Sequence, residues 1–167
     1  MKIGLISDTH GHFEASILQY FDKCDEVWHL GDIGTVAVLD QLTAHFKVRS
    51  VFGNIDGHDI RVRSREFLAF QLSGKKFLLI HIAGKPPRYN PQVRKLIYQY
   101  RPDVLICGHS HMLSVQQDPQ NQLLFINPGA AGKHGFHKKK TLIRFDLDQG
   151  RMSNMEVIEL GNRASLS

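Results

Sequence analysis

The sequence lacks three features that would point to a secreted or membrane-bound protein. It has only two cysteines, too few for the disulfide framework of a small secreted domain. No hydrophobic run approaches the roughly 18 apolar residues that a membrane-spanning helix needs, and the amino terminus shows neither the long apolar segment nor the cleavage site of a signal peptide. We therefore expect a soluble cytoplasmic protein with no membrane association. We also expect Cys107, which ends an apolar run, to be a buried and unreactive thiol.

Internal repeats and low-complexity tracts are also absent, and the composition is that of an ordinary globular protein. The 167 residues are 42% hydrophobic and 22% charged, enough for one domain with a sizeable core. We expect a single domain over residues 1–167, with a frayed polar tail at 162–167. The net charge of +5 favours acidic partners or anionic substrates, although such an excess is also typical of a solvated surface. Charge alone does not favour a nucleic-acid binder.

Five short apolar runs, each followed at once by polar residues, are the most informative feature of the chain. Their length and their branched or aromatic residues predict buried strands at 3–6, 27–30, 48–52, 77–80 and 104–107. The polar clusters that follow contain Asp8 and His10, Asp32, Asn54 and Asp56, His81, and His109 and His111. Functional groups of open α/β sheets collect beyond the carboxyl ends of the strands, so the five clusters are predicted to form one site.

The remaining pattern predicts an α/β fold with two packed sheets and helices outside. Apolar residues at helical spacing indicate helices at 14–21 and 36–46, and Pro91 and Pro102 bracket a third at 92–100. Alternation of strands and helices in the first part favours parallel strands. Further strands are predicted at 66–72, 112–117, 123–126, 141–147 and 152–160, with turns at 118–121 and 148–150.

Taken singly, each polar cluster has a structural explanation. Asp and Asn after Gly are common in turns, and a lone His81 could be a satisfied interior histidine. Asp8 with His10, and His109 with His111, are better ligand signals because alternate side chains of an extended segment point the same way. Five metal-competent strand ends together predict a metal site, and seven donors exceed what one four-coordinate ion uses. We therefore expect two divalent ions, Mn²⁺, Fe²⁺, Zn²⁺ or Ni²⁺, with one carboxylate shared between them.

The ordered set Asp-x-His, Gly-Asp, Gly-Asn-x-Asp, His and Gly-His-x-His resembles the calcineurin-like metallophosphoesterase superfamily. The short chain is similar to its small YfcE-like phosphodiesterase branch. The resemblance implies a four-layer α/β/β/α sandwich and hydrolysis of a phosphoester by a metal-bridging hydroxide. It also implies that Asp8, His10 and His111 hold one ion and that Asn54, His81 and His109 hold the other, with Asp32 between them. We expect Mn²⁺ as the native metal and Asp32, Asn54 and His109 as the catalytic residues.

Two departures from the family pattern concern the substrate side of the site. Ile55 stands where many relatives have a histidine that can protonate the leaving group, and Ile82 begins a proline-rich stretch where close relatives have Gly-His. We expect this stretch to line the pocket. We expect Asp56 to orient a ligand, since ligating histidines usually need a carboxylate or carbonyl on the other ring nitrogen. The remaining candidates for a proton donor are His12, His58 and His134, each of which could equally be a solvent-exposed loop residue.

Three functions fit these residues to different degrees. We expect a phosphodiesterase or phosphomonoesterase acting on a small or nucleotide-like substrate. A nuclease would need a longer basic and aromatic-lined surface than residues 133–140 offer, and we expect those residues to be a solvated hairpin face, with phosphate contact as the alternative. A non-enzymatic scaffold, like the eukaryotic retromer subunit of similar fold, would leave seven clustered polar side chains unexplained. Homo-oligomers are compatible with the sequence.

Overall fold

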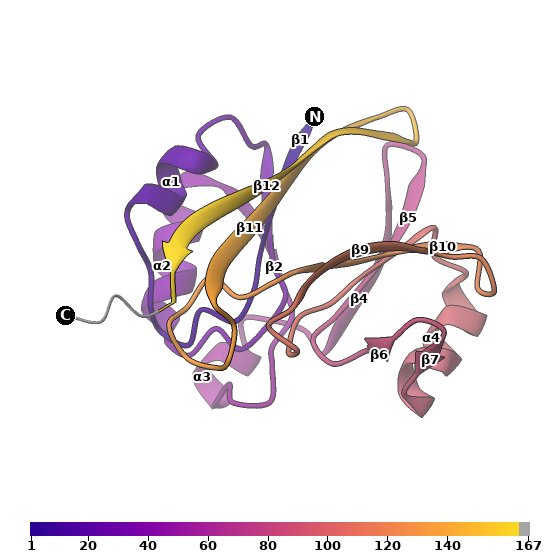
Figure 1. Cartoon of the computed structure of the whole chain (residues 1–167), viewed down its shortest axis with the longest axis horizontal. Coiled ribbons are helices and arrows are strands. Elements are labelled where there is room, and N and C mark those ends of the chain that lie inside the picture. Colours follow the sequence, from indigo (N-terminus) through magenta and orange to yellow (C-terminus); the bar gives the residue numbers. More distant parts are fainter. Residues whose placement is uncertain (164–167) are drawn as a thin grey trace.

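Two mixed sheets of five strands each form the centre of the molecule (Figure 1). The computed structural model describes residues 1–163. The first sheet contains, in spatial order, β12 (Arg151–Asn162), β11 (Lys139–Asp148), β1 (Lys2–Ile6), β2 (Glu26–His29) and β3 (Lys47–Ser50). The second contains β4 (Phe67–Leu72), β5 (Lys75–Ile80), β8 (Val104–Ile106), β10 (Leu123–Pro128) and β9 (Leu113–Asp118). The helices are α1 (Ser16–Tyr20), α2 (Val36–His45), α3 (His58–Arg61) and α4 (Pro91–Tyr100), and β6 (Gly84–Lys85) pairs with β7 (Arg88–Tyr89).

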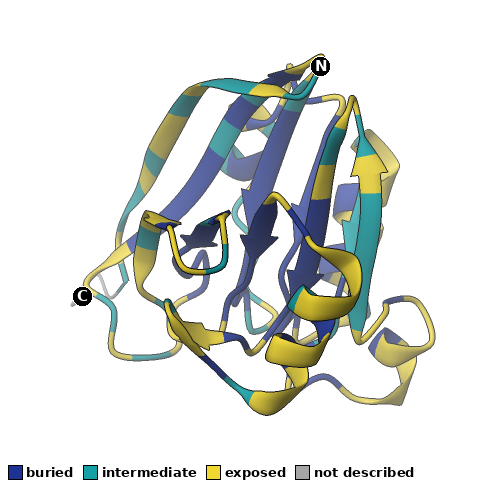
Figure 2. Ribbon diagram, turned by 90° about the vertical axis from the view of Figure 1, so that its right-hand side faces the viewer, coloured by how far each residue is buried: buried dark blue, intermediate teal, exposed yellow. Residues whose placement is uncertain are grey.

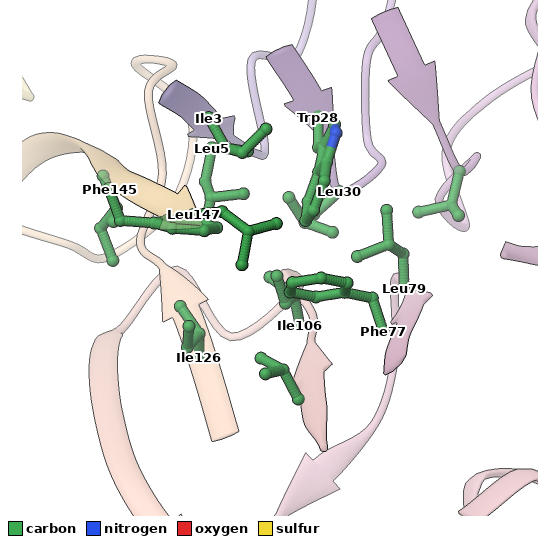
Figure 3. Packing of buried hydrophobic residues seen from close by; sticks show 13 residues of the cluster. Ile3, Leu5, Trp28, Leu30, Phe77, Leu79, Ile106, Ile126, Phe145 and Leu147 are labelled. Carbon is green, nitrogen blue, oxygen red and sulfur yellow. The ribbon is translucent and has the colours of Figure 1, made fainter. Parts of the chain in front are cut away.

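The largest hydrophobic cluster lies between the two sheets (Figure 3). Side chains of β1, β2 and β11 meet side chains of β5, β8 and β10 there. Trp28 is fully buried at the centre, with its ring edge-to-face against Phe77 at 4.9 Å and Phe70 at 5.3 Å between centroids. The indole N–H donates to Glu26 at 2.9 Å, so this large aromatic side chain is buried without an unsatisfied donor.

Two further clusters join the outer faces of the sheets to the helices. Ile17, Phe21, Leu39 and Leu42 pack α1 and α2 against the first sheet, and Val93 and Leu96 pack α4 against the second. In Figure 2 the central strands are buried and the helices expose their outer faces. The predicted four-layer α/β/β/α sandwich is therefore confirmed.

Strand direction explains why the polar clusters converge. Strands β1, β2 and β3 run parallel in the first sheet, and β5, β8 and β10 run parallel in the second. Antiparallel strands flank these parallel sets in both sheets. The carboxyl ends of the parallel strands therefore carry the loops that hold the polar clusters.

The helix predictions were right in place and differ in length. The α2 helix matches its prediction within one residue, and α4 begins one residue early because Asn90 accepts the Val93 N–H at 2.9 Å and Pro91 occupies the first helical position. The first predicted helix is shortened to five residues, without a side-chain cap. The α3 helix and the β6–β7 hairpin were not predicted. No helix among residues 1–163 is long and apolar enough to cross a bilayer.

Two predictions about the carboxyl-terminal region need correction. The tail was expected to fray from Asn162, but Asn162 pairs with Lys139 in the sheet and the Arg163 side chain donates to the His137 and Lys133 carbonyls; residues 164–167 lie outside the described residues. Residues 133–140 were expected to be solvated; Lys133, His134, Phe136, Lys138 and Lys139 are exposed, but Lys140 is buried and pairs with Glu14. A buried lysine needs such a partner, and the pair links β11 to the segment before α1.

Candidate metal centre

Six of the seven predicted ligands form two groups that share one residue. Ligand atoms of Asp8, His10, Asp32 and His111 lie within 4.8 Å of one another, and so do those of Asp32, His81 and His109. We call these the first group and the second group. Asp32 belongs to both, the position that the resemblance gave to a bridging carboxylate. The seventh predicted ligand, Asn54, adjoins the second group through its side-chain oxygen, 3.0 Å from His109 Nδ1.

The first group surrounds a fully buried carboxylate. Asp8 Oδ2 accepts the Ser7 hydroxyl at 2.5 Å and the His109 backbone N–H at 3.1 Å. Asp8 Oδ1 lies 3.1 Å from His111 Nε2, and Asp32 Oδ2 lies 3.6 Å from His10 Nε2. One oxygen of Asp8 is thus held by the protein while the other faces the histidines.

The second group is built around His81, which is 3% exposed. His81 Nδ1 donates to the Leu30 carbonyl at 2.6 Å, which leaves Nε2, 3.2 Å from Asp32 Oδ1, as the free nitrogen. Burial alone would lower the pKa of His81, but Asp32 and Asp8 outweigh it and raise that pKa. Burial alone would raise the pKa of Asp32, but His81 and the Ile55 N–H outweigh it, so the carboxylate stays ionised. An ionised carboxylate is the form that binds a metal ion.

Buried polar atoms without partners identify where an ion fits. Among the described residues, four buried side-chain nitrogen or oxygen atoms have no hydrogen-bond partner, and three of them, Asp8 Oδ1, His10 Nε2 and His81 Nε2, belong to the two groups. Leaving such atoms unsatisfied costs about 1–3 kcal/mol each. Imidazole nitrogens and carboxylate oxygens suit divalent transition metals, so the residues present fit such ions.

The backbone at the site is strained in a consistent way. Left-handed φ angles between +47° and +67° occur at five of the predicted ligands: Asp8, His10, Asp32, His109 and His111. Non-glycine residues adopt this region infrequently, and it costs of order 1–3 kcal/mol at each position. Such strain persists where the surrounding structure fixes it, and here it turns alternate side chains towards one point.

Two glycines allow the loops to approach each other. A Cβ atom on Gly31 would lie 2.5 Å from His81 Nδ1, and a Cβ atom on Gly53 would lie 2.0 Å from Asp32 Oδ1. Gly31 also has a φ of +96°, which side-chain-bearing residues rarely adopt. The Gly-Asp and Gly-Asn pairs of the sequence therefore serve close packing around Asp32.

Comparison with known proteins agrees with this geometry. A family model described as the calcineurin-like phosphoesterase superfamily domain matches residues 1–150. The chain belongs to this superfamily. A probable metallophosphoesterase of Mycoplasma pneumoniae is 32% identical over 161 residues, covering 92% of this chain and 94% of that relative.

Solved structures support the fold of this superfamily member. An archaeal phosphodiesterase superposes with a TM-score of 0.75 at 23% identity, covering 96% of this chain and all of that one. Vps29 of Entamoeba histolytica in complex with zinc superposes with a TM-score of 0.72 at 17% identity, covering 98% of this chain and all of that one. At these identities the likeness concerns the fold alone.

Asp56 acts through the backbone. Among residues 1–163 its carboxylate forms no hydrogen bond or ion pair with a histidine; it accepts the backbone N–H groups of Ile33 at 3.1 Å, Gly34 at 2.8 Å and Gly53 at 2.8 Å. These amides lie next to Asp32 and Asn54 in the chain. Asp56 therefore holds two loops together through their backbones, a role that neither spacing nor residue type could reveal.

The three proposed proton donors have different surroundings in the structure. The His134 ring lies 4.8 Å from the His10 ring, which brings it to the first group. His12 Nε2 is 3.0 Å from Glu14, the carboxylate that also pairs with Lys140, so His12 has a structural partner. His58 begins α3, is exposed, and forms no side-chain hydrogen bond or ion pair within residues 1–163. Only His134 meets a predicted ligand.

Sequence reasoning missed two supporting residues. His29 is fully buried, and its Nδ1 accepts the Gly31 N–H at 3.2 Å. Its Nε2 lies 3.0 Å from the Thr9 hydroxyl, which donates to the Ile33 carbonyl. Burial lowers the pKa of His29 to about 4, so the ring is neutral and braces the loops of Asp8 and Asp32. Asn127 donates to the Gly108 carbonyl at 2.8 Å and to the Ser110 hydroxyl at 3.0 Å. A histidine within a buried apolar run was the only available signal for His29.

Cys107 matches its prediction. The thiol is buried beside Asn127, and burial raises its pKa well above the ordinary value. A thiol in this state is a poor nucleophile and a poor metal ligand. The candidate metal centre therefore offers nitrogen and oxygen donors.

Proposed function

We propose that this metallophosphoesterase is a phosphodiesterase that hydrolyses a small, nucleotide-like phosphodiester with two divalent cations, Mn²⁺ in the native protein. The observation that carries the proposal is the pair of ligand groups sharing Asp32, each with atoms within 4.8 Å. A single structural ion would not need a second group. An archaeal phosphodiesterase has the same fold, and we take diesters before monoesters as the substrates to test.

The two groups divide the ligands by position. We assign Asp8, His10 and His111 to one cation, His81, His109 and Asn54 to the other, and Asp32 to both. Two divalent cations supply a coordinated water of lowered pKa and a positive clamp for phosphoryl oxygens when they are bound.

Hydrogen bonds within the protein fix the orientation of the proposed ligands. With the proton on its Nδ1, His109 donates to the Asn54 amide oxygen, which fixes the ring and leaves Nε2 for the centre. A carbonyl oxygen has two lone pairs, so Asn54 can bond to His109 and still act as a ligand. Asp8 and Asp32 carry the negative charge that favours cations, and Ser7 and Ile55 fix one oxygen of each.

A scaffold function, as expected from the resemblance to the retromer subunit of similar fold, is the second candidate. It would not require two cation sites with unsatisfied buried atoms. Nuclease activity would require a longer basic surface, and the burial of Lys140 shortens the one in residues 133–140.

A substrate panel tests the proposal. Metal-stripped protein is reloaded with Mn²⁺, Ni²⁺, Zn²⁺ or Fe²⁺ and assayed on bis(p-nitrophenyl) phosphate, cyclic nucleotides and p-nitrophenyl phosphate. We expect metal-dependent hydrolysis of diesters. Turnover of the monoester alone would replace the diesterase assignment, and inactivity with every metal and substrate would favour the scaffold.

A further inference from the structure

A pocket of about 230 Å³ opens beside the second group and reaches away from the first. Asn54 and His81 line it, whereas Asp8, His10 and His111 do not. A phosphoryl group held between the two groups could therefore place one organic part of the ester in this pocket. The pocket residues beyond the ligands then decide what that part can be.

The floor of the pocket is apolar. Phe52, Ile80 and Ile82 line it. The expectation that the stretch after His81 lines the pocket holds for Ile82, while Pro86, Pro87 and Pro91 lie outside the lining. Such a floor favours a ring system over a small polar alcohol.

Arg61 lies over this floor with unused donors. Its guanidinium carbon is 4.4 Å from the Phe52 ring centroid, and its Nε donates to the Asp56 carbonyl at 2.7 Å. Its terminal N–H groups form no hydrogen bond or ion pair within the described part of the chain, residues 1–163. A guanidinium fixed on one face by an aromatic ring can stack a second planar group on its other face.

Glu66 supplies an acceptor in the same pocket. Its Oε1 accepts the Gln92 side-chain amide at 2.8 Å, and no lysine, arginine or histidine of residues 1–163 pairs with it. Glu66 precedes β4 and Gln92 belongs to α4, so two elements fix the carboxylate. An ionised carboxylate accepts hydrogen bonds only, so it selects a group with hydroxyl or N–H donors.

We propose that this pocket binds the organic part of the substrate ester and that this part is a nucleoside. Its planar base would stack against Arg61, and a hydroxyl or ring N–H would donate to Glu66. A phenyl ester would fill the apolar floor but leave Glu66 without a donor, and an extended acyl chain would meet both charged groups. The inference rests on the proposed function and specifies the substrate class of the same site.

Three substrates that share one chromophore test the nucleoside assignment. They are the p-nitrophenyl esters of thymidine monophosphate, phenyl phosphate and methyl phosphate. Consumption of each diester is followed by chromatography, which detects hydrolysis whichever of the two alcohols leaves. Because the site hydrogen-bonds donors of the nucleoside, we expect kcat/KM to be about tenfold higher for the thymidine ester than for the phenyl ester. The methyl ester should be the poorest.

Conservative substitutions test the two charged residues. Glu66→Gln and Arg61→Lys should each lower the ratio of the thymidine to the phenyl kcat/KM by about tenfold, since a stacked or hydrogen-bonded group is lost. The exposed residues Glu159 and Arg151 on β12, at the edge of the first sheet opposite β3, provide the matched controls Glu159→Gln and Arg151→Lys, which should leave the ratio unchanged. No preference for the thymidine ester in the unmodified protein, or an unchanged ratio in both pocket variants, would overturn the inference.

A binding experiment separates failure of the pocket from failure of the proposed function. Thymidine monophosphate added to metal-free protein should shift the methyl NMR signals of Ile80 and Ile82, and the shifts should saturate at higher concentration in Glu66→Gln. Shifts confined to other parts of the molecule would overturn the pocket assignment even if diesters are hydrolysed. Absence of hydrolysis with the expected shifts would overturn the phosphodiesterase and keep the nucleoside pocket.

Discussion

The first and second groups share Asp32 but differ in their surroundings. The first group has a second carboxylate, Asp8, which is fully buried and fixed by two hydrogen bonds. The second group pairs buried His81 with exposed His109, and exposed Asn54 beside it lines the 230 Å³ pocket together with His81. From this difference in burial we expect firmer cation binding in the first group and easier access for a ligand in the second. The first group should therefore bind its cation more tightly.

The largest loss of turnover should come from replacing Asp32, the residue that the two groups share. Asp32→Asn removes the charge that both use, and we expect turnover to fall by on the order of 10³-fold, as for loss of an essential catalytic group. Circular dichroism should show an intact fold, because the core between the sheets is untouched. Asp148→Asn, at the exposed turn between β11 and β12, is the matched control. Retention of both ions and near-normal turnover in Asp32→Asn would contradict the shared role.

The difference in burial between the two groups predicts different losses of cation affinity when Asp8 and Asn54 are replaced. Asp8→Asn should weaken binding of the tighter cation by more than about 100-fold, whereas Asn54→Ala should weaken the other cation by about 10–100-fold. Calorimetric titration of metal-stripped variants with Mn²⁺ measures both. A larger loss in Asn54→Ala than in Asp8→Asn would reverse the comparison.

Asp56 supports both groups through the backbone. Replacing it should therefore have a smaller effect than replacing a predicted ligand, and this effect should be on stability. Asp56→Ala leaves three amides of the Asp32 and Asn54 loops without their acceptor, which should lower the free energy of unfolding by about 1–3 kcal/mol. Denaturant unfolding of metal-free protein measures this loss. Asp59→Ala, at an exposed neighbouring position, is the control, and equal stability of the two variants would remove the proposed bracing.

His134 tests whether the first group also serves proton transfer. His134→Ala should slow hydrolysis of a methyl ester more than that of a nitrophenyl ester, by about 10-fold or more, because only the poorer leaving group needs a proton. His58→Ala, which changes an exposed histidine without site contacts, should slow neither. Equal slowing of both esters by His134→Ala would exclude the role.

His29 braces the loops of Asp8 and Asp32, and its effect on stability should appear only at acidic pH. Its folded pKa of about 4 lies below the ordinary value of 6.5, so the unfolded chain takes up a proton first as the pH falls. The contribution of neutral His29 to the free energy of unfolding is complete above pH 6.5. It is lost between pH 6.5 and about 4, a loss of roughly 3 kcal/mol. Urea unfolding of metal-free protein across this range should show a shallower pH dependence in His29→Gln. Parallel curves for the two proteins would show that His29 does not titrate as described.

The sequence predicted which polar side chains lie together better than it predicted the lengths of the elements around them. Asp8, His109 and the other ligands follow buried strands, and strand ends are defined by apolar periodicity and glycine, both of which are local. The bracing by His29, Asp56 and Asn127 depends on which loops meet in space, so no local pattern carries it. The α1 helix was overestimated because its apolar spacing extends beyond the five residues that are helical.

The number of cations bound by the metal-stripped and reloaded chain tests the central claim most directly. Mass spectrometry of native protein, or anomalous scattering from Mn²⁺-soaked crystals, counts them. The shared position of Asp32 predicts two ions per chain, one in each group. A single ion at saturating Mn²⁺, or none, would contradict a centre of two cations.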